Sequence, residues 1–228
     1  MATYFKDNFE WDFGMYLSQI HLVSSKVNES IKKFSECLSS QNEETTKDIE
    51  IIEDFGSVEI NPDLSASLIS LFENLKNEAF YNSLLISSYS FLEFSVIEYC
   101  RLIEVYLKKN IRLAKINKIG LFKAQKFLRK AVGLDISTLP AWKDIEIYRK
   151  HRNIVIHNYA NIIQTSNKPI EKQNDYNVLH NIANLEITSA GYIFITNIDY
   201  INNLLDISSG FLSDIIENTK KTFTNEQK

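Results

Sequence analysis

Glycine and proline are scarce in this chain of 228 residues, which contains six glycines and three prolines. Folds built mainly from β-strands use both residue types at their many tight turns, so this scarcity favours helices. The length suffices for one sizeable core and is short for two. Composition therefore predicts an all-α fold, and no repeat or linker in the sequence divides residues 1–228 into separate domains.

Cysteine and histidine are also rare, with two and four copies. The spacing of Cys37 and Cys100 fits neither a metal site nor a disulfide framework, which favours a reducing compartment, the cytoplasm. His21 and His180 stand alone in the sequence, whereas a zinc site needs several converging ligands. We therefore expect no metal and no cofactor.

Long uncharged apolar runs are lacking, so the sequence predicts no membrane span. Residues 1–7 lack the basic start and the apolar run of a signal peptide. The net charge of −4 argues against a general nucleic-acid coat protein, although the distribution of charge matters more than its sum.

One segment reverses the overall charge balance, because residues 106–134 contain no acidic residue. The basic residues of this segment, which we call the basic strip, are Lys108, Lys109, Arg112, Lys115, Lys118, Lys123, Lys126, Arg129 and Lys130. One interpretation is a solvated helix face, which is how most charge runs behave. The other is a surface that binds RNA phosphates without sequence preference.

Apolar residues recur every three or four positions over most of the chain, which predicts helices. A first helix is expected over residues 9–38, followed by an acidic stretch over residues 39–54. That stretch is either a solvated connection or a segment that mimics a phosphate backbone and covers a basic site. With Asn61 as N-cap and Pro62 at the first helical position, a helical pattern is expected to run to about Lys109, either as one long helix or with a break near Asn77. An N-terminal helix and connection thus occupy residues 1–60, and the core is predicted within residues 61–222.

The second half of the chain is expected to complete a helical bundle around this long central helix. A short helix should end at Gly133, and the next should open near residues 138–140 and continue to Ile162. Residues 164–175 are polar and include Pro169, which indicates a loop. One minor β-hairpin is predicted near residues 185–195, followed by a last amphipathic helix over residues 197–221.

The helix expected before Ile162 carries the candidate site. Its apolar stripe, with residues three or four apart, comprises Ile145, Tyr148, Val155, Tyr159 and Ile162. Arg152 occupies a place in this stripe where an apolar residue is expected, and a guanidinium there costs several kcal/mol unless an anion meets it. Glu93 of the long helix is the candidate partner, and otherwise it is a surface glutamate at the edge of that helix's stripe. His157 lies about 140° around the axis, on a polar face with Lys150 and Asn153.

Arg152, Asn153 and His157 carry a resemblance to a known family. Arg152-Asn153, three further residues and His157 resemble the Arg-(four to six residues)-His motif of HEPN domains, in which a polar residue often follows the arginine. A long upstream helix with an acidic residue in an aromatic setting, here Glu93 within residues 88–94, is similar as well. The resemblance covers about residues 65–205. HEPN domains are all-helical domains of many prokaryotic RNases, toxins and defence proteins, so the resemblance implies a HEPN-like helical bundle.

The resemblance also implies a function, that of a metal-independent endoribonuclease acting as a toxin or a phage-defence effector. The ribose 2′-hydroxyl would attack the adjacent phosphorus and leave a 2′,3′-cyclic phosphate and a 5′-hydroxyl. His157 is then the general base or acid. Arg152 stabilises charge on the phosphoryl oxygens, and Asn153 orients the imidazole or the substrate. Glu93 would support Arg152.

The expected partners follow from the same reaction. One chain supplies one motif histidine, whereas in-line transfer works best with a base and an acid on opposite sides. We therefore expect a homodimer with both motifs at a two-fold interface. RNA is the expected substrate, and an antitoxin or regulatory protein a further partner. The competing interpretation is a non-catalytic helical module that binds RNA or protein, with Arg152 as a structural ion-pair partner in the core.

Overall fold

The computed structural model describes residues 62–107, 111–163 and 169–225. The helix expected over residues 9–38, the acidic stretch over residues 39–54, and Lys108 and Lys109 lie outside these ranges. The chain divides into two compact units, Met1–Leu71 and Phe72–Lys228. The expected single domain over residues 1–228 stays a prediction.

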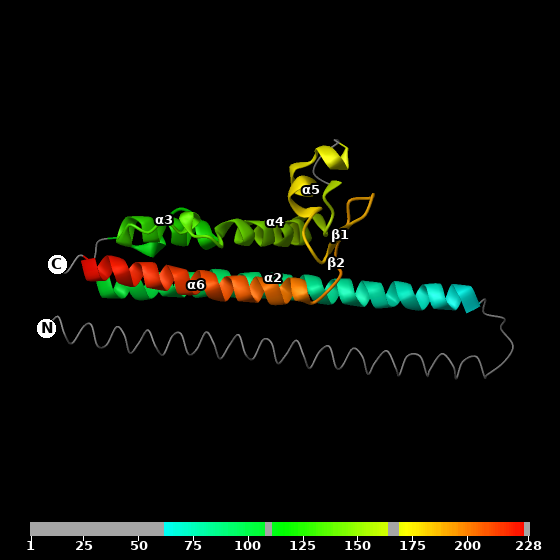
Figure 1. Cartoon of the computed structure of the whole chain (residues 1–228), viewed down its shortest axis with the longest axis horizontal. Coiled ribbons are helices and arrows are strands. Elements are labelled where there is room, and N and C mark those ends of the chain that lie inside the picture. The colour runs from blue at the N-terminus through cyan, green and yellow to red at the C-terminus, as the bar shows by residue number, and fades with distance from the viewer. Residues whose placement is uncertain (1–61, 108–110, 164–168, 226–228) are drawn as a thin grey trace, which may run out of the picture. The chain divides into compact units, whose positions relative to one another are not determined.

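Five helices and one hairpin make up the regular structure of the described ranges (Figure 1). The helices are α2 (Pro62–Leu107), α3 (Gly120–Val132), α4 (Trp142–Asn158), α5 (Asn174–Leu179) and α6 (Asp199–Asn225). The strands are β1 (Leu185–Ile187) and β2 (Ile193–Ile195), and short 3-10 turns cover Leu113–Lys115, Ile136–Thr138 and Ile170–Lys172. This mostly helical fold confirms the predicted all-α class with its minor hairpin. Within these ranges, no helix has both the length and the apolar character needed to cross a membrane.

The long helix α2 begins at Pro62, as predicted, and continues without a break to Leu107. Its buried side chains follow the apolar stripe read from the sequence and include Leu85, Tyr89, Leu92, Val96, Tyr99 and Ile103. Burial raises the pKa of Tyr99, and the hydroxyl of Thr219 in α6 partly offsets that rise. This interaction between Tyr99 and Thr219 places α2 and α6 in one core.

Aromatic rings mark where α3, α4 and α6 meet. The ring of Trp142 at the start of α4 lies 6.1 Å from that of Phe122 in α3 and 6.1 Å from that of Phe211 in α6. Further along α4, the rings of Tyr148 and Tyr200 are 4.8 Å apart. These large side chains bury much apolar area, so they fix α4 against both neighbouring helices.

The hairpin formed by β1 and β2 is antiparallel, as predicted, with Leu185 opposite Ile195 and Ile187 opposite Ile193. Ile193 belongs to a small buried cluster with Ile154, Ile162 and Leu179, which come from α4, the segment after it and α5. The hairpin therefore packs on the C-terminal part of α4 (Figure 1).

Backbone hydrogen bonds also join the segment after α4 to the hairpin. The N–H of Ile162 donates to the carbonyl oxygen of Gly191, and the N–H of Ile193 donates to that of Ala160, each at 2.9 Å. Asn161 and Tyr192 thereby form an isolated antiparallel bridge. The end of α4 is held in place by these bonds.

The short helix α5 was not predicted, and its first two residues fall within the loop expected over residues 164–175. Its one buried residue is Leu179, so it shows no repeating apolar pattern. Its first turn contains Asp175, whose carboxylate lies 3.6 Å from the ammonium nitrogen of Lys150 in α4. This contact adds a second link between α5 and α4.

Candidate functional site

All three motif residues, Arg152, Asn153 and His157, belong to α4. The helix stops before the predicted end at Ile162, because Tyr159 adopts a left-handed conformation with φ of 52°, and Ala160 follows with φ of 56°. The N–H groups of Tyr159 and Ala160 both donate to the carbonyl oxygen of the same residue in the last turn. The motif histidine therefore lies one residue before the end of the helix.

The buried face of α4 differs from the predicted one. Its buried residues are Ile145, Tyr148, His151 and Ile154. Arg152 is only partly buried and Tyr159 is 79% exposed, so the predicted stripe is wrong at both positions. The helix is rotated so that His151 enters the core instead. An imidazole can be buried in its neutral form, whereas a guanidinium keeps its charge and is costly to bury.

His151 is the centre of a polar network between α4 and α6. Its Nδ1 atom lies 3.0 Å from the hydroxyl oxygen of Tyr200. The Tyr148 hydroxyl donates to the carbonyl oxygen of Tyr200 at 3.3 Å and accepts a hydrogen bond from the amide of Asn203 at 3.0 Å. Burial lowers the pKa of His151 to about 3, so the imidazole is neutral near pH 7. This histidine is part of the core, and it is not accessible to a substrate.

Arg152 does not form the expected ion pair with Glu93 in the described part of the chain. Its Nη1 atom donates to the Oδ1 atom of Asn153 at 3.0 Å. Its Nε atom is buried and has no hydrogen-bond partner among the described residues. The guanidinium is thus held at one edge by Asn153, and its charge is not neutralised by a carboxylate there.

Glu93 instead faces the start of α3. A Cβ atom added to Gly120, the first residue of α3, would collide with the Glu93 carboxylate, so the two residues are in close contact. α3 has no acidic residue in its first turn and no side-chain cap at Ile119. The carboxylate therefore provides the negative charge that a helix N-terminus favours.

The buried hydroxyl of Tyr89 shows that Glu93 and Arg152 still share one electrostatic environment. Burial is the main cause that raises the pKa of Tyr89, and the carboxylates of Glu93 and Glu146 add to it. Arg149 and Arg152 act in the opposite direction. The Tyr89 hydroxyl is therefore affected by both Glu93 and Arg152, although no ion pair joins these two side chains.

Arg149, one turn before Arg152, makes the ion pair that was expected of Arg152. Its Nε and Nη2 atoms lie 2.8 Å and 2.9 Å from the two carboxylate oxygens of Glu146 on the same helix. Its guanidinium also lies 5.1 Å from the centre of the Phe122 ring. The hydrogen bonds to Glu146 are the main cause that raises the pKa of Arg149. Arg149 therefore has a structural role, whereas Arg152 pairs with no carboxylate among the described residues.

His157 is exposed on α4, and Asn153 lies one turn before it. Residues four apart on a helix lie on the same face, so Asn153 is a neighbour of both His157 and Arg152. Two exposed side chains with large apolar parts lie near His157 in the sequence: Ile156, directly before it, is 38% exposed, and Tyr159, two residues after it, is 79% exposed. The motif therefore borders an apolar surface.

Two arginines of the basic strip are paired with carboxylates. Arg112 lies 3.2 Å from Glu104, and Arg129 lies 3.9 Å from Asp135. The lysines of the strip that form no ion pair within the described segments are Lys115, Lys118, Lys123, Lys126 and Lys130. These five lysines are here called the unpaired lysines, and they leave a positive charge around α3 and the turn before it.

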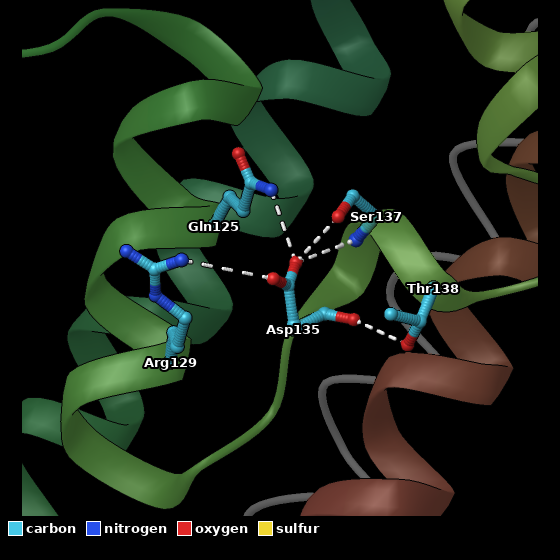
Figure 2. A network of polar contacts seen from close by, with 5 residues as sticks. All are labelled: Gln125, Arg129, Asp135, Ser137 and Thr138. Carbon is cyan, nitrogen blue, oxygen red and sulfur yellow. Dashed lines mark hydrogen bonds and ion pairs between the residues drawn. The ribbon is translucent and has the colours of Figure 1, made fainter.

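The carboxylate of Asp135 organises the turn between α3 and α4 (Figure 2). Its Oδ1 atom accepts hydrogen bonds from the Gln125 amide and from the N–H and hydroxyl of Ser137, at 2.7–3.0 Å. The bond from Gln125, followed by those from Ser137, holds the pKa of Asp135 below its usual range. Arg129 of the basic strip is therefore partly engaged in holding this turn.

The described residues contain no group of three His, Cys, Asp or Glu side chains placed to hold a metal ion. Comparison of the chain with protein-family models, with curated proteins and with solved structures gave no match.

Proposed function

We propose that the protein is a metal-independent endoribonuclease in which Arg152, Asn153 and His157 act together. The 2′-hydroxyl of the substrate attacks the adjacent phosphorus, and the products carry a 2′,3′-cyclic phosphate and a 5′-hydroxyl. His157 accepts the proton of the 2′-hydroxyl or donates one to the leaving 5′-oxygen. Arg152 donates hydrogen bonds to the phosphoryl oxygens as negative charge grows on them. Control by an antitoxin or regulatory protein, as in a toxin or a phage-defence effector, belongs to the same proposal.

The hydrogen bond from Arg152 to Asn153 is the observation that supports this proposal best. Arg152 and His157 lie about 140° apart around the helix axis, so their side chains do not converge by helix geometry alone. The 3.0 Å bond to Asn153 Oδ1 draws the guanidinium toward the face that His157 occupies. A guanidinium without a carboxylate partner is suited to bind a phosphate through its planar set of donors.

The unpaired lysines support RNA as the substrate. Their charge is not offset by carboxylates among the described residues, although the whole chain is acidic. Such lysines bind phosphates of any sequence, and their contribution falls as the salt concentration rises. Binding would thus depend on the lysines and cleavage on the motif.

A homodimer completes the proposed reaction. Each chain presents one exposed motif histidine, and two copies related by a two-fold axis would supply a base and an acid to one cleft. Because each copy contributes a residue to the site, the proposal requires the dimer for full activity.

Cleavage of mixed RNA in EDTA, followed by analysis of the product ends, tests the proposal. We expect cyclic-phosphate and 5′-hydroxyl ends, and no cleavage of DNA or of RNA methylated at the 2′ position, which lacks the nucleophile. His157→Ala should abolish cleavage and leave RNA affinity nearly unchanged. His180→Ala is the matched control, because this exposed histidine stacks on Tyr176 and is outside the motif. Arg152→Lys should also be inactive, because a point charge does not replace the planar donors.

The possible results separate the two classes of function. Products with 3′-hydroxyl ends, or cleavage that requires a divalent ion, would refute the mechanism. RNA binding without cleavage of any substrate would instead favour the non-catalytic module. Equal activity of His157→Ala and His180→Ala would show that the motif histidine has no role in the reaction.

A further inference from the structure

The residue that ends α4 has an unusual combination of backbone and side chain. Tyr159 has φ of 52°, and its side chain is 79% exposed, two residues after His157. Within the described segments its ring has no aromatic contact and its hydroxyl no hydrogen bond. Left-handed φ values suit glycine and disfavour a side chain with a Cβ atom, so this conformation must be held by the surrounding structure.

The end of α3 shows the same pair of backbone hydrogen bonds with glycine at the left-handed position. There Gly133 has φ of 72°, and the N–H groups of Gly133 and Leu134 both donate to the carbonyl oxygen of Leu128. At the end of α4, Tyr159 and Ala160 make the equivalent bonds to a carbonyl oxygen of the last turn. Folding alone would therefore favour glycine at position 159. A strained residue with a large exposed side chain beside a candidate site is an indication of function.

A second exposed ring lies on the adjacent hairpin. Tyr192 is 43% exposed, and its backbone bridges to Asn161, two residues after Tyr159. The close approach depends on Gly191, with φ of 83°, because a Cβ atom there would collide with the side chain of Ile163. Backbone bonds hold both segments, so the backbone positions that carry the two rings are fixed relative to one another.

We propose that Tyr159, together with Tyr192, is a platform on which an unpaired base of single-stranded RNA stacks while a phosphate of that strand lies at Arg152 and His157. This inference rests on the proposed endoribonuclease function and adds a substrate class to it. Aromatic side chains stack on bases of any sequence, provided that the bases are not already stacked within a duplex. The platform therefore selects single strands, loops and bulges over duplex RNA, and not a particular sequence.

Binding of a short single-stranded RNA with one internal 2-aminopurine tests the inference. The parent is the full chain carrying His157→Ala, so that the RNA stays intact. Stacking on tyrosine should quench the fluorescence of the 2-aminopurine base. Tyr159→Gly should abolish the quenching and weaken binding roughly 5- to 150-fold, the loss measured for stacked bases. Tyr159→Phe should bind like the parent because it keeps the ring.

Two controls separate stacking from general effects. Phe94→Leu removes another exposed aromatic ring, 60% exposed on α2, and should not change binding. Tyr159→Gly should leave the melting temperature unchanged or higher, since glycine suits the local φ. A duplex RNA should bind the parent and Tyr159→Gly equally.

Three results would overturn the inference. If Tyr159→Gly binds single-stranded RNA as tightly as the parent, the platform does not exist, while the proposed cleavage still stands. If Tyr159→Gly loses affinity and also dissociates the oligomer or lowers the melting temperature, the ring is a subunit or core contact. If neither the parent nor the wild-type chain binds any single-stranded RNA, the proposed function fails together with the inference.

Discussion

The buried, neutral state of His151 predicts that the protein loses stability at mildly acidic pH. The unfolded chain binds a proton at this residue below about pH 6.5. The folded protein does not, because burial lowers the folded pKa to about 3. Because the pKa of His151 is lower in the folded protein than in the unfolded chain, neutral His151 contributes fully to the free energy of unfolding above the unfolded pKa. This contribution is lost progressively as the pH falls from about 6.5 toward 3.

The size of the effect follows from the two pKa values. Each unit of pH below 6.5 removes about 1.4 kcal/mol, so lowering the pH from 7 to 5 should reduce the free energy of unfolding by about 2 kcal/mol through this residue alone. His151→Asn keeps a polar partner near the Tyr200 hydroxyl and does not titrate. The variant should be less stable at pH 7, because it leaves a small cavity, yet its stability should change less between pH 7 and pH 5.

Urea unfolding at fixed protein concentration, at pH 7, 6 and 5, measures this difference. The difference between wild type and variant removes the contribution of carboxylates that titrate in both proteins. His157→Asn is the matched control, because it makes the same substitution at an exposed histidine outside the buried network of His151. Parallel pH profiles for wild type and His151→Asn would refute the burial of a neutral histidine in the core.

Three further predictions concern residues around the candidate site. Arg152→Ala should lower the free energy of unfolding in urea by less than about 1 kcal/mol, because no carboxylate loses its partner. A decrease of about 3 kcal/mol or more would mean that Arg152 has a buried counterion. Gly120→Ala should destabilise the protein by about 1 kcal/mol, seen as a lower melting temperature, since φ is 52° and the new Cβ atom displaces the Glu93 carboxylate. The hydrogen bonds that lower the pKa of Asp135 stabilise the folded protein above the pKa of this carboxyl in the unfolded chain. This stabilisation is lost as the pH falls through its pKa in the folded protein. Asp135→Asn should therefore melt below wild type at pH 7, and the gap should narrow as the pH falls through the folded pKa of Asp135, whereas a gap that does not change with pH would contradict the contribution of charge.

Sequence periodicity was sufficient to predict the elements whose apolar positions repeat over several turns. The stripe of α2 from Leu85 to Ile103 is of this kind, whereas the stop at Gly133 and the hairpin were predicted from glycine and from strand-forming residues. Local spacing determines such features, so no knowledge of distant residues is needed. α5 has a single buried residue, Leu179, and therefore gave no comparable signal.

The rotation of α4 could not be predicted from its own residues, because positions 151 and 152 both fit the spacing of the stripe. The choice depends on Tyr200, which lies 49 residues later and meets His151 in the core. The readiness of histidine to become neutral was the one available signal in favour of position 151. The sequence also did not show that Arg149, and not Arg152, forms the ion pair. Glu146 and Arg149 are three residues apart on one helix, a spacing shared by many surface pairs that contribute little to stability.

The backbone bridge between the end of α4 and the hairpin has a consequence for amide hydrogen exchange. The N–H groups of Ile162 and Ile193 are both donors in this bridge, so they become exchangeable only when the segment separates from the hairpin. Because Ala160 accepts one of these bonds, that separation also releases the turn that follows His157. The exchange rates of these two amides therefore report how often the motif end opens in the intact protein. A ligand that requires the closed turn should slow both rates together.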